Sequence, residues 1–589
     1  MPTRSDTNAK ALALRLAFEK AGATLVEPPL LQPAETLLDL YGEDIRGRAY
    51  VTSDAVRGEQ MLRPDFTVPV VQMHMADGAE PACYTYSGDV FRRQDDHSDR
   101  PNEYVQVGYE VFDRTDPAAA DAEVFSLIAR AVGTLPVTPV TGDIGLLKAA
   151  VMGLDTSKAR RAALMRHIWR PKKFSALLNR FGNRTKPSEI RRSLLDAPDP
   201  FAEVAVFTGK RSKSDIVQRI DALKEDAQDP PISPDDMSRI DTLLSIRGSL
   251  PDAIDALTQL SLDSPAIKDA VAGLSARRDA LQARGVTVDS LMFETQHGRT
   301  SMEYYDGFVF GFYADAYPDM PAVATGGRYD ALTARLGRGS AIPAVGGVLP
   351  RPAAGFGGDA MTIKLGVPSK GRLMDKTFAW FADRGVHLSR TGSDREYAGR
   401  VDGVDDVSLV LLSAGEVPRE LAEGRLHLGV TGTDLVHEKL PRWNHVVEPV
   451  FEMGFGFADL VLAVPNCWVD VDTFEDLDSA AAQFRAAYGS RLRIATKYHR
   501  LVREALREAG VADYALVDSQ GATEGTVVNE TAEAIADITS SGETLRANHL
   551  KILSDGLILK SQATLWLSKV ADMDNAQRKT LDKLTDKLS

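Results

Sequence analysis

The stretch from Asp537 to Leu545 brings two acids, four hydroxyl side chains and a glycine together within nine residues. An apolar, β-prone run at 534–538 leads into a Ser/Gly turn, and residues 543–550 are predicted to form a helix. A strand-turn-helix of this kind directs several backbone N–H groups into one concavity, and the helix N-terminus adds partial positive charge. The stretch is therefore predicted to bind a phosphate, with Asp537 placed to hold ribose hydroxyls or a bound Mg²⁺. Taken alone, it also fits a Ser/Gly turn that caps a surface helix.

Residues 361–589 contain four further motifs that accompany this loop. They are Leu-Gly-Val-Pro-Ser-Lys-Gly-Arg-Leu at 365–373, Leu-Gly-Val-Thr-Gly-Thr-Asp at 428–434, Arg-Leu-Arg-Ile-Ala-Thr-Lys-Tyr at 491–498 and Gly-Ala-Thr-Glu at 521–524. Together the motifs resemble ATP phosphoribosyltransferase, the first enzyme of histidine biosynthesis, in its short form. The resemblance implies a glycosyltransferase reaction in which N1 of ATP displaces pyrophosphate from phosphoribosyl pyrophosphate, with Mg²⁺ as cofactor.

The same half of the chain alternates short apolar strands with helices, as a two-lobed α/β fold should. The expected strands are 362–367, 407–412, 427–431, 459–464, 492–495 and 534–538. The resemblance implies lobes of the periplasmic-binding-protein type, with the second lobe at about 465–550. A non-enzymatic alternative, a two-lobed small-molecule binding protein, fits this architecture, but nothing in that class requires the loop at 537–545.

The implied displacement builds positive charge on the ribose and negative charge on the departing pyrophosphate, so the enzyme should supply cations to the leaving group. Candidate catalytic residues are Lys370 and Arg372, in the first strand-to-helix turn, and Arg395, because arginine forks match phosphate oxygens. Each of them also fits a cation at a helix end. The resemblance assigns the contacts to phosphoribosyl pyrophosphate to Lys497, Glu524, Asp537, Thr539, Ser540, Ser541, Gly542, Glu543 and Thr544. Mg²⁺ is expected to enter with the substrate, with Asp537 as its candidate protein ligand.

Two positions depart from the transferase pattern in ways that bear on the site. Glu543 puts a carboxylate in an anion-binding loop, so its side chain must point away from the phosphate. His427 stands where an aspartate is common, and we expect a structural role for it. No strong general base is required, since N1 of adenine carries no proton near neutral pH.

The first half carries a second set of ordered motifs. They are Leu-Arg-Pro-Asp-Phe-Thr at 62–67, Phe-Arg-Arg-Gln at 91–94, Gln-Val-Gly-Tyr-Glu at 106–110, Glu-Tyr-Tyr at 303–305 and Gly-Gly-Arg-Tyr-Asp at 326–330. These motifs resemble the catalytic core of histidyl-tRNA synthetase over roughly residues 5–350, which implies a class II antiparallel-sheet domain. A histidine pocket needs carboxylates together with neutral or aromatic groups. By resemblance, these are Asp65, Thr67, Gln106, Glu110, Tyr305 and Tyr329.

Several synthetase features are missing. Thr300 stands where the synthetase has a catalytic arginine, and Gln94 replaces a glutamate of the ATP-binding motif. The last motif is degenerate at 347–351, and no anticodon-binding domain follows. These losses resemble the regulatory subunit that accompanies short-form transferases, so the first half is expected to sense histidine as a feedback inhibitor. A scaffold that completes an oligomer and an active synthetase fused to the transferase are the alternatives.

The Pro- and Gly-rich stretch at 351–360 is predicted to be a linker between a regulatory domain at 1–350 and a catalytic domain at 361–589. A net charge of −14 argues against non-specific nucleic-acid binding. The two cysteines, the absence of an apolar signal core and the lack of a membrane-length run favour a cytoplasmic protein without a membrane partner. Both resembled families form multimers, so we expect a homo-oligomer.

Overall fold

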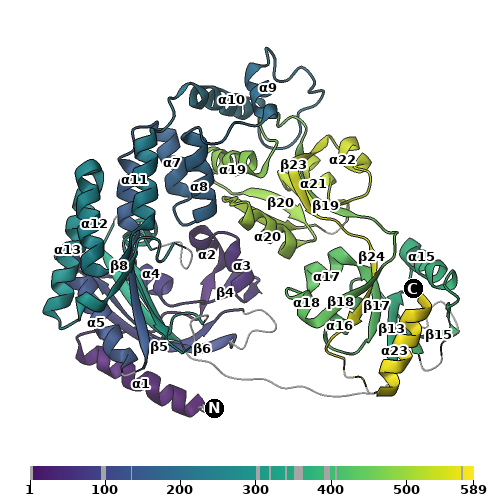
Figure 1. Ribbon diagram of the computed structural model, residues 1–589, viewed down its shortest axis with the longest axis horizontal. Coiled ribbons are helices and arrows are strands. Elements are labelled where there is room, and N and C mark those ends of the chain that lie inside the picture. Colours follow the sequence, from purple (N-terminus) through teal and green to yellow (C-terminus); the bar gives the residue numbers. More distant parts are fainter. Residues whose placement is uncertain are drawn as a thin grey trace. The chain divides into compact units, whose positions relative to one another are not determined.

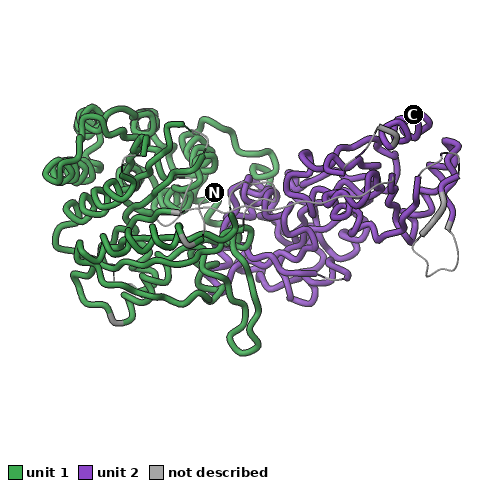
Figure 2. The backbone as a smooth tube through the Cα atoms, turned by 90° about the horizontal axis from the view of Figure 1, so that it is seen from below, with its two compact units in different colours: residues 1–94, 99–193, 221–354 green, residues 95–98, 194–220, 355–589 purple. Residues whose placement is uncertain are grey.

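The computed structural model describes residues 4–93, 101–133, 135–299, 305–316, 320–337, 341–350, 363–390, 398–402, 404, 407–519, 521–571, 573 and 575–588. The described chain divides into two compact units, drawn in different colours in Figure 2. Unit 1 takes the described residues up to 193 and those from 221 to 350, whereas unit 2 takes residues 194–220 and those from 363 onward. The sequence predicted a single linker at 351–360, which lies outside the described residues, and gave no sign that 194–220 would join the second unit.

Unit 1 is built on a nine-stranded sheet that is largely antiparallel (Figure 1). Its strands, in spatial order, are β1 (Thr24–Leu25), β5 (Ala82–Phe91), β6 (Glu103–Phe112), β12 (Ala344–Pro350), β11 (Ala324–Arg328), β10 (Phe308–Ala314), β7 (Val137–Asp143), β9 (Met292–Glu294) and β8 (Arg247–Ser249). Only the β1–β5 and β7–β9 pairs are parallel. The antiparallel sheet expected for this half is confirmed.

Helices and a small second sheet complete unit 1. The small sheet consists of β2 (Leu31–Pro33), β4 (Gly58–Leu62) and β3 (Val51–Asp54). The helices are α1 (Arg4–Lys20), α2 (Ala34–Tyr41), α3 (Asp44–Arg48), α4 (Thr67–Asp77), α5 (Pro117–Val132), α6 (Ile144–Met152), α7 (Lys158–Arg166), α8 (Pro171–Phe181), α11 (Pro234–Ser245), α12 (Leu250–Asp263), α13 (Lys268–Ala283) and α14 (Asp330–Leu336), together with α9 (Glu189–Asp196) and α10 (Lys213–Gln228), which carry residues of both units. Local sequence determines where α5 begins and ends. The Asp116 side chain accepts a hydrogen bond from the Ala119 amide at its start, and Gly133 follows its last residue.

The first lobe of unit 2 is a seven-stranded sheet with helices on both faces. The strands, in spatial order, are β14 (His387–Arg390), β15 (Ala398–Asp402), β16 (Val407–Leu412), β13 (Ile363–Pro368), β17 (Leu428–Gly432), β24 (Ala563–Ser568) and β18 (Val447–Glu452). One apolar core joins α15 (Gly371–Ala382) and α23 (Asn575–Leu588) to the sheet. A second core joins α16 (Val417–Ala422), α17 (Thr433–Lys439) and α18 (Trp443–Val446). Figure 1 shows the two groups of helices on opposite sides of β13 and β17.

The second lobe of unit 2 is a five-stranded sheet covered by four helices. Its strands are β21 (Tyr514–Asp518), β20 (Leu492–Thr496), β22 (Ala534–Thr539), β19 (Asp459–Pro465) and β23 (Leu550–Leu559), and its helices are α19 (Phe474–Tyr488), α20 (His499–Glu508), α21 (Gly525–Val528) and α22 (Glu543–Ala547). The six strands expected for the second half are confirmed to within one residue at each end, and the two-lobed fold is confirmed. The sheet of this lobe extends from Asp459 to Leu559.

Two chain crossings connect the lobes, one between β18 and β19 and one between β23 and β24. The crossings are hydrogen-bonded to each other, because the Ala458 amide donates to the Ser561 carbonyl and the Ala563 amide donates to the Phe455 carbonyl, each over 2.9 Å. The link between the lobes is therefore a paired, two-stranded ribbon.

In the part of the chain that the structure describes, no helix combines the length and apolar character needed to cross a lipid bilayer.

Candidate functional sites

The loop that the sequence singled out follows β22 and opens α22. Gly542 has a positive φ of 70°, a conformation that glycine adopts without strain. The Thr539 hydroxyl accepts a hydrogen bond of 2.9 Å from the Gly542 amide, and Arg546 donates to the Ser541 carbonyl over 2.9 Å. The helix expected at 543–550 is shorter, ending at Ala547, because β23 begins at Leu550. Phosphate binding here would therefore depend on the turn more than on a helix dipole.

The exposed face of the turn carries the polar side chains of the motif. Ser540, Ser541, Glu543 and Thr544 are exposed, while Thr539 is half-buried. The exposure of Glu543 lets its carboxylate turn into solvent, as an anion site requires.

Lys497 and Asp537 lie close together at one edge of the second lobe's sheet. Their strands, β20 and β22, are parallel neighbours, with Thr496 paired to Ala536. Because the carboxyl ends of parallel strands meet at one edge, the two side chains approach each other, and Lys497 Nζ lies 3.8 Å from Asp537 Oδ2. Lys497 Nζ also donates to the Gly521 carbonyl over 2.9 Å. The lysine thus lies between Asp537, at the end of β22, and the segment that carries Glu524.

Glu524 occupies the position just before α21 and is half-buried. The preceding residues are ordered by a hydrogen bond of 3.1 Å between the hydroxyls of Ser519 and Thr523, both of which are buried. The structure therefore assembles Lys497, Glu524, Asp537 and the loop 539–544 from three consecutive strand ends of one lobe.

The predicted cations of the first lobe lie at the start of α15. Lys370 precedes this helix and Arg372 lies in its first turn, and both are exposed. Arg395 lies outside the described residues. Among the described residues, no hydrogen bond or ion pair joins Lys370 or Arg372 to the second-lobe group. His427 is buried and its Nδ1 accepts a hydrogen bond from the Lys364 amide over 3.0 Å, which supports its expected structural role.

A polar cluster that the sequence did not assign joins the two lobes. The Tyr498 hydroxyl donates to Asp434 Oδ2 over 2.8 Å, and the Ser561 hydroxyl donates to Asp434 Oδ1 over 2.7 Å. Asp434 belongs to the first lobe, Tyr498 to the second, and Ser561 to the connecting ribbon. Burial, followed by the Asp434 charge, raises the pKa of Tyr498, so the hydroxyl stays protonated and donates.

A second contact between the lobes lies beside this cluster. Glu438 of α17 accepts hydrogen bonds of 3.0 Å from the amides of Arg500 and Leu501, in the first turn of α20. A carboxylate at a helix N-terminus is favourable because the first amides have no helical partners. The motif at 428–434 contained Asp434, but only the fold brings it to Tyr498.

Unit 1 contains a buried cluster of polar side chains around Glu110. Glu110 Oε1 accepts hydrogen bonds from the Tyr86 hydroxyl at 2.8 Å and the Thr67 hydroxyl at 3.2 Å, and Oε2 accepts one from Tyr329 at 2.5 Å. Burial raises the pKa of Glu110 to about 7, although these three hydroxyls pull it down. A ligand that brings positive charge would stabilise the ionised carboxylate.

Asp65 contributes a second carboxylate to the same region. Its Oδ2 accepts a hydrogen bond of 2.9 Å from Tyr41, whereas its Oδ1 is buried and has no hydrogen-bond partner. A buried acceptor without a partner costs free energy, and a ligand ammonium would satisfy it. Gln106 lies on the same strand as Glu110 and accepts a hydrogen bond of 3.3 Å from the Phe66 amide.

Glycines on neighbouring strands make room for these side chains. A Cβ atom on Gly346, which pairs with Glu110, would lie 1.5 Å from Glu110 Oε2. A Cβ on Gly108 would lie 2.2 Å from the Tyr86 hydroxyl oxygen. Tyr305 packs against Gly327 in the same way, with a Cβ there only 2.8 Å from its ring. These glycines therefore let the sheet accommodate the side chains of the cluster.

Both halves match known families. The protein-family model described as ATP phosphoribosyltransferase matches residues 413–589, and the model described as histidyl-tRNA synthetase matches residues 4–225 and 214–350. An ATP phosphoribosyltransferase from Cereibacter sphaeroides is 70% identical over 216 residues, covering 37% of this chain and 92% of that relative. The chain belongs to both families. An ATP phosphoribosyltransferase from Sinorhizobium medicae is 49% identical over 213 residues, covering 36% of this chain and 92% of that relative.

Two solved structures also align with parts of the chain. An ATP phosphoribosyltransferase regulatory subunit/histidyl-tRNA synthetase from Bacillus halodurans is 20% identical, with a TM-score of 0.42, and the alignment covers 65% of this chain and 88% of that one. An ATP phosphoribosyl transferase (HisG:HisZ) complex from Thermotoga maritima is 23% identical, with a TM-score of 0.30, and the alignment covers 38% of this chain and 95% of that one.

The family matches confirm the sequence interpretation that a synthetase-like half precedes an ATP phosphoribosyltransferase half, and the chain is an enzyme of the glycosyltransferase type. The roles of individual residues stay predictions. Sequence reasoning missed Tyr86 and Tyr41 in the synthetase-like cluster, and Asp434 and Glu438 between the transferase lobes. It placed Tyr498 beside Lys497 but did not predict its bond to Asp434. The alternating aromatic and polar residues at 84–87 mark Tyr86 as a candidate, but its contact with Glu110 depends on the register between β5 and β6.

Proposed function

We propose that the transferase half condenses ATP with phosphoribosyl pyrophosphate to give phosphoribosyl-ATP and pyrophosphate, and that the synthetase-like half binds histidine and inhibits this reaction. The family matches support the transferase activity. The observation that carries the histidine proposal is the pair of buried carboxylates. Burial raises the pKa of Glu110 to about 7, and Asp65 Oδ1 has no hydrogen-bond partner. An amino acid with two cationic groups would place one positive charge beside each of these carboxylates.

In the transferase half, the second-lobe group would hold phosphoribosyl pyrophosphate. The turn at 539–544 offers amides and hydroxyls to the 5′-phosphate, while Glu524 and Asp537 accept hydrogen bonds from ribose hydroxyls. Lys497, close to Asp537, adds the positive charge that a phosphorylated sugar needs. Lys370, Arg372 and Arg395 would neutralise the departing pyrophosphate from the first lobe.

Mg²⁺ is expected to arrive with the substrate. The metal prefers one or two carboxylates plus substrate phosphates over a complete protein cage. Asp537 is the carboxylate proposed to hold the metal together with the substrate; the described residues contain no group of three or more Asp, Glu, His or Cys side chains placed to hold a metal ion. Bound there, Mg²⁺ would neutralise charge on the pyrophosphate group.

The synthetase-like half is proposed to lack aminoacylation activity. Thr300, which replaces the catalytic arginine, lies outside the described residues. The adjacent Arg299 does not supply that arginine's charge, because it is buried, donates to the Ile168 carbonyl over 2.9 Å and lies 5.1 Å from the centre of the Phe174 ring. A cytoplasmic location and a homo-oligomeric state belong to the same proposal, and cell fractionation and light scattering test them.

The deciding experiment measures phosphoribosyl-ATP formation from ATP and phosphoribosyl pyrophosphate with Mg²⁺, in the presence and absence of histidine. Turnover that histidine suppresses is the expected result. Turnover indifferent to histidine would leave the enzyme and reduce the first half to a scaffold. Ligand binding without turnover would favour the binding-protein alternative, and charging of tRNA would favour the active synthetase.

A further inference from the structure

Residues 194–220 belong by sequence to the synthetase-like half but pack with the second lobe of the transferase half. We call this segment the strap. Two of its side chains, Ile216 and Ile220 of α10, are 0% and 2% exposed and lie in the same apolar core as Trp468 and Leu477. Val217, on another face of α10, is 38% exposed. The strap therefore completes a core that the transferase sequence alone leaves open.

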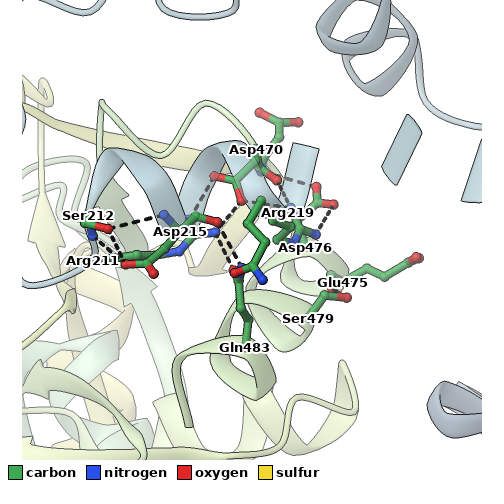
Figure 3. Close-up of polar contacts among 11 residues, drawn as sticks. Arg211, Ser212, Asp215, Arg219, Asp470, Glu475, Asp476, Ser479 and Gln483 are labelled. Atoms are coloured by element: carbon green, nitrogen blue, oxygen red, sulfur yellow. Dashed lines mark hydrogen bonds and ion pairs between the residues drawn. The ribbon is translucent and has the colours of Figure 1, made fainter. Parts of the chain in front are cut away.

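A buried charge cluster fixes the strap to this lobe (Figure 3). Arg211 donates to both carboxylate oxygens of Asp470, at 2.8 and 2.6 Å, and the two side chains are 1% and 0% exposed. Arg219 donates to Asp470 Oδ2 at 3.1 Å and to Asp476 Oδ1 at 3.2 Å. Burial alone would raise the pKa of Asp470, but hydrogen bonds and charge from the two arginines hold it below its ordinary value.

This arrangement makes the strap hard to remove. A buried carboxylate that loses its charged partners keeps its desolvation cost and gains nothing in return. Without the strap, Asp470 would lose both arginines that bind it. Two more hydrogen bonds join this lobe to the strap at Asp215. The Tyr488 hydroxyl donates to the Asp215 carboxylate over 2.7 Å, and the Gln483 side chain donates to the Asp215 backbone carbonyl over 2.9 Å.

The strap also passes close to the segment that carries a proposed substrate residue. Gly209 has a φ of +81°, and a Cβ atom there would lie 3.5 Å from Val527 Cγ1. Val527 belongs to α21, the short helix that starts directly after Glu524. The strap thus passes beside the helix whose first residue follows that carboxylate, and a methyl group at position 209 would fill the space between them.

The helix α10 is anchored again at its other end, in unit 1. There Arg160 of α7 donates to Asp226 Oδ1 and to the Asp226 carbonyl, each over 2.6 Å, and to the Pro230 carbonyl over 2.8 Å. One continuous helix therefore carries buried arginine contacts in the transferase lobe near its start and in the synthetase-like half near its end.

We propose that the strap is a non-covalent docking element, which holds the synthetase-like half on the second lobe of the transferase half and carries histidine inhibition to α21. The docking part stands on the contacts alone. The inhibitory part rests on the proposed function.

Cleavage of the full chain between its halves tests the docking. A protease recognition site is placed within 351–360, the purified chain is cut, and the fragments are analysed by gel filtration. We expect the fragments of the otherwise unchanged chain to elute together and those of the Arg211→Glu, Arg219→Glu double variant to separate. The matched control is Arg184→Glu, which breaks a 3.1 Å ion pair with Asp241 between side chains that are 47% and 54% exposed. Fragments of the double variant that still elute together would overturn the proposal.

Charge reversal at a buried site can unfold the chain, so a milder double variant repeats the measurement. Arg211→Lys, Arg219→Lys keeps the charge but cannot form the two-pronged contact with Asp470. We expect it to raise the dissociation constant of the cut fragments by about tenfold. An unchanged dissociation constant in this variant, with native circular dichroism, would also overturn the docking.

The same cut samples test inhibition. The unchanged cut chain should make phosphoribosyl-ATP and be inhibited by histidine, whereas the arginine variants should turn over without responding to histidine. Arginine variants that remain histidine-sensitive would overturn the inhibitory role. If the unchanged chain makes no phosphoribosyl-ATP, the proposed function fails, while the fragment elution still decides the docking.

Discussion

Tyr498 donates its hydroxyl hydrogen to Asp434 over 2.8 Å, and this bond joins the second transferase lobe to the first. Tyr498 directly follows Lys497, the proposed substrate cation. The bond therefore ties the position of that cation to the relative placement of the lobes.

Replacement of Tyr498 by phenylalanine should weaken this connection. Asp434 would keep only the Ser561 hydroxyl as a side-chain donor, and a buried carboxylate that loses a donor typically costs about 1–3 kcal/mol. Urea unfolding of the full chain measures the loss, and steady-state kinetics should show a raised KM for phosphoribosyl pyrophosphate. Ser561→Ala and the double variant complete a cycle, in which strictly additive effects would show that the two donors do not share Asp434 as described.

Lys497→Met should lower kcat/KM for phosphoribosyl pyrophosphate by about two orders of magnitude or more, because the methionine keeps the side-chain length and removes the charge proposed to face the substrate. Lys583→Met, on the exposed side of α23, is the matched control and should leave the kinetics unchanged. A Lys497→Met enzyme with normal kinetics would remove this lysine from the site.

The pKa of Glu110, about 7, gives the synthetase-like half a predictable pH dependence. A carboxyl group whose folded-state pKa is raised contributes stability while it is protonated. That contribution is complete below the ordinary value of 4.5 and is lost as the pH rises through about 7. Between pH 5 and pH 8 the unliganded wild type should therefore lose more unfolding free energy than Glu110→Gln, by about 3 kcal/mol at most. Parallel stability curves for the two proteins would contradict the assignment.

Histidine binding should favour the ionised form of Glu110, whereas folding of the unliganded protein favours the protonated form. A cationic ligand favours the ionised carboxylate, so binding near neutral pH should release a proton from Glu110. Calorimetry in two buffers of different ionisation enthalpy measures this release. Glu110→Gln should bind more weakly and release fewer protons, and an unaltered proton count would place the titrating group elsewhere.

Gly346→Ala should disrupt the proposed histidine site and leave the transferase activity intact. The added Cβ would lie 1.5 Å from Glu110 Oε2, so the carboxylate or the strand must move. We expect transferase activity to persist while the concentration of histidine needed for half-inhibition rises at least about tenfold. Gly273→Ala is the control, since a Cβ on that helical residue meets nothing within 4 Å. Wild-type sensitivity to histidine in Gly346→Ala would separate the proposed histidine site from inhibition.

Local motifs predicted those parts of the fold whose residues are close in the sequence. The strand and turn around Gly542 could be predicted, because a β-prone run and a glycine with positive φ are local features. The Tyr86–Glu110 and Gly346–Glu110 contacts could not, since they depend on the register of strands far apart in the chain. The strap was missed for a related reason: the apolar face of Ile216 and Ile220 indicates a buried helix side, but says nothing of what covers it.

The paired ribbon between the transferase lobes limits how those lobes can move. Two hydrogen-bonded crossings, one at 453–458 and one at 560–562, define a line about which the lobes can bend, and they resist both sliding and twisting. Substrate groups held on opposite lobes would then approach each other along an arc, by hinge bending about this line. The alignment of the reactants would be set by a single hinge angle. Ser561, on the ribbon, donates to the same Asp434 carboxylate as Tyr498 of the second lobe.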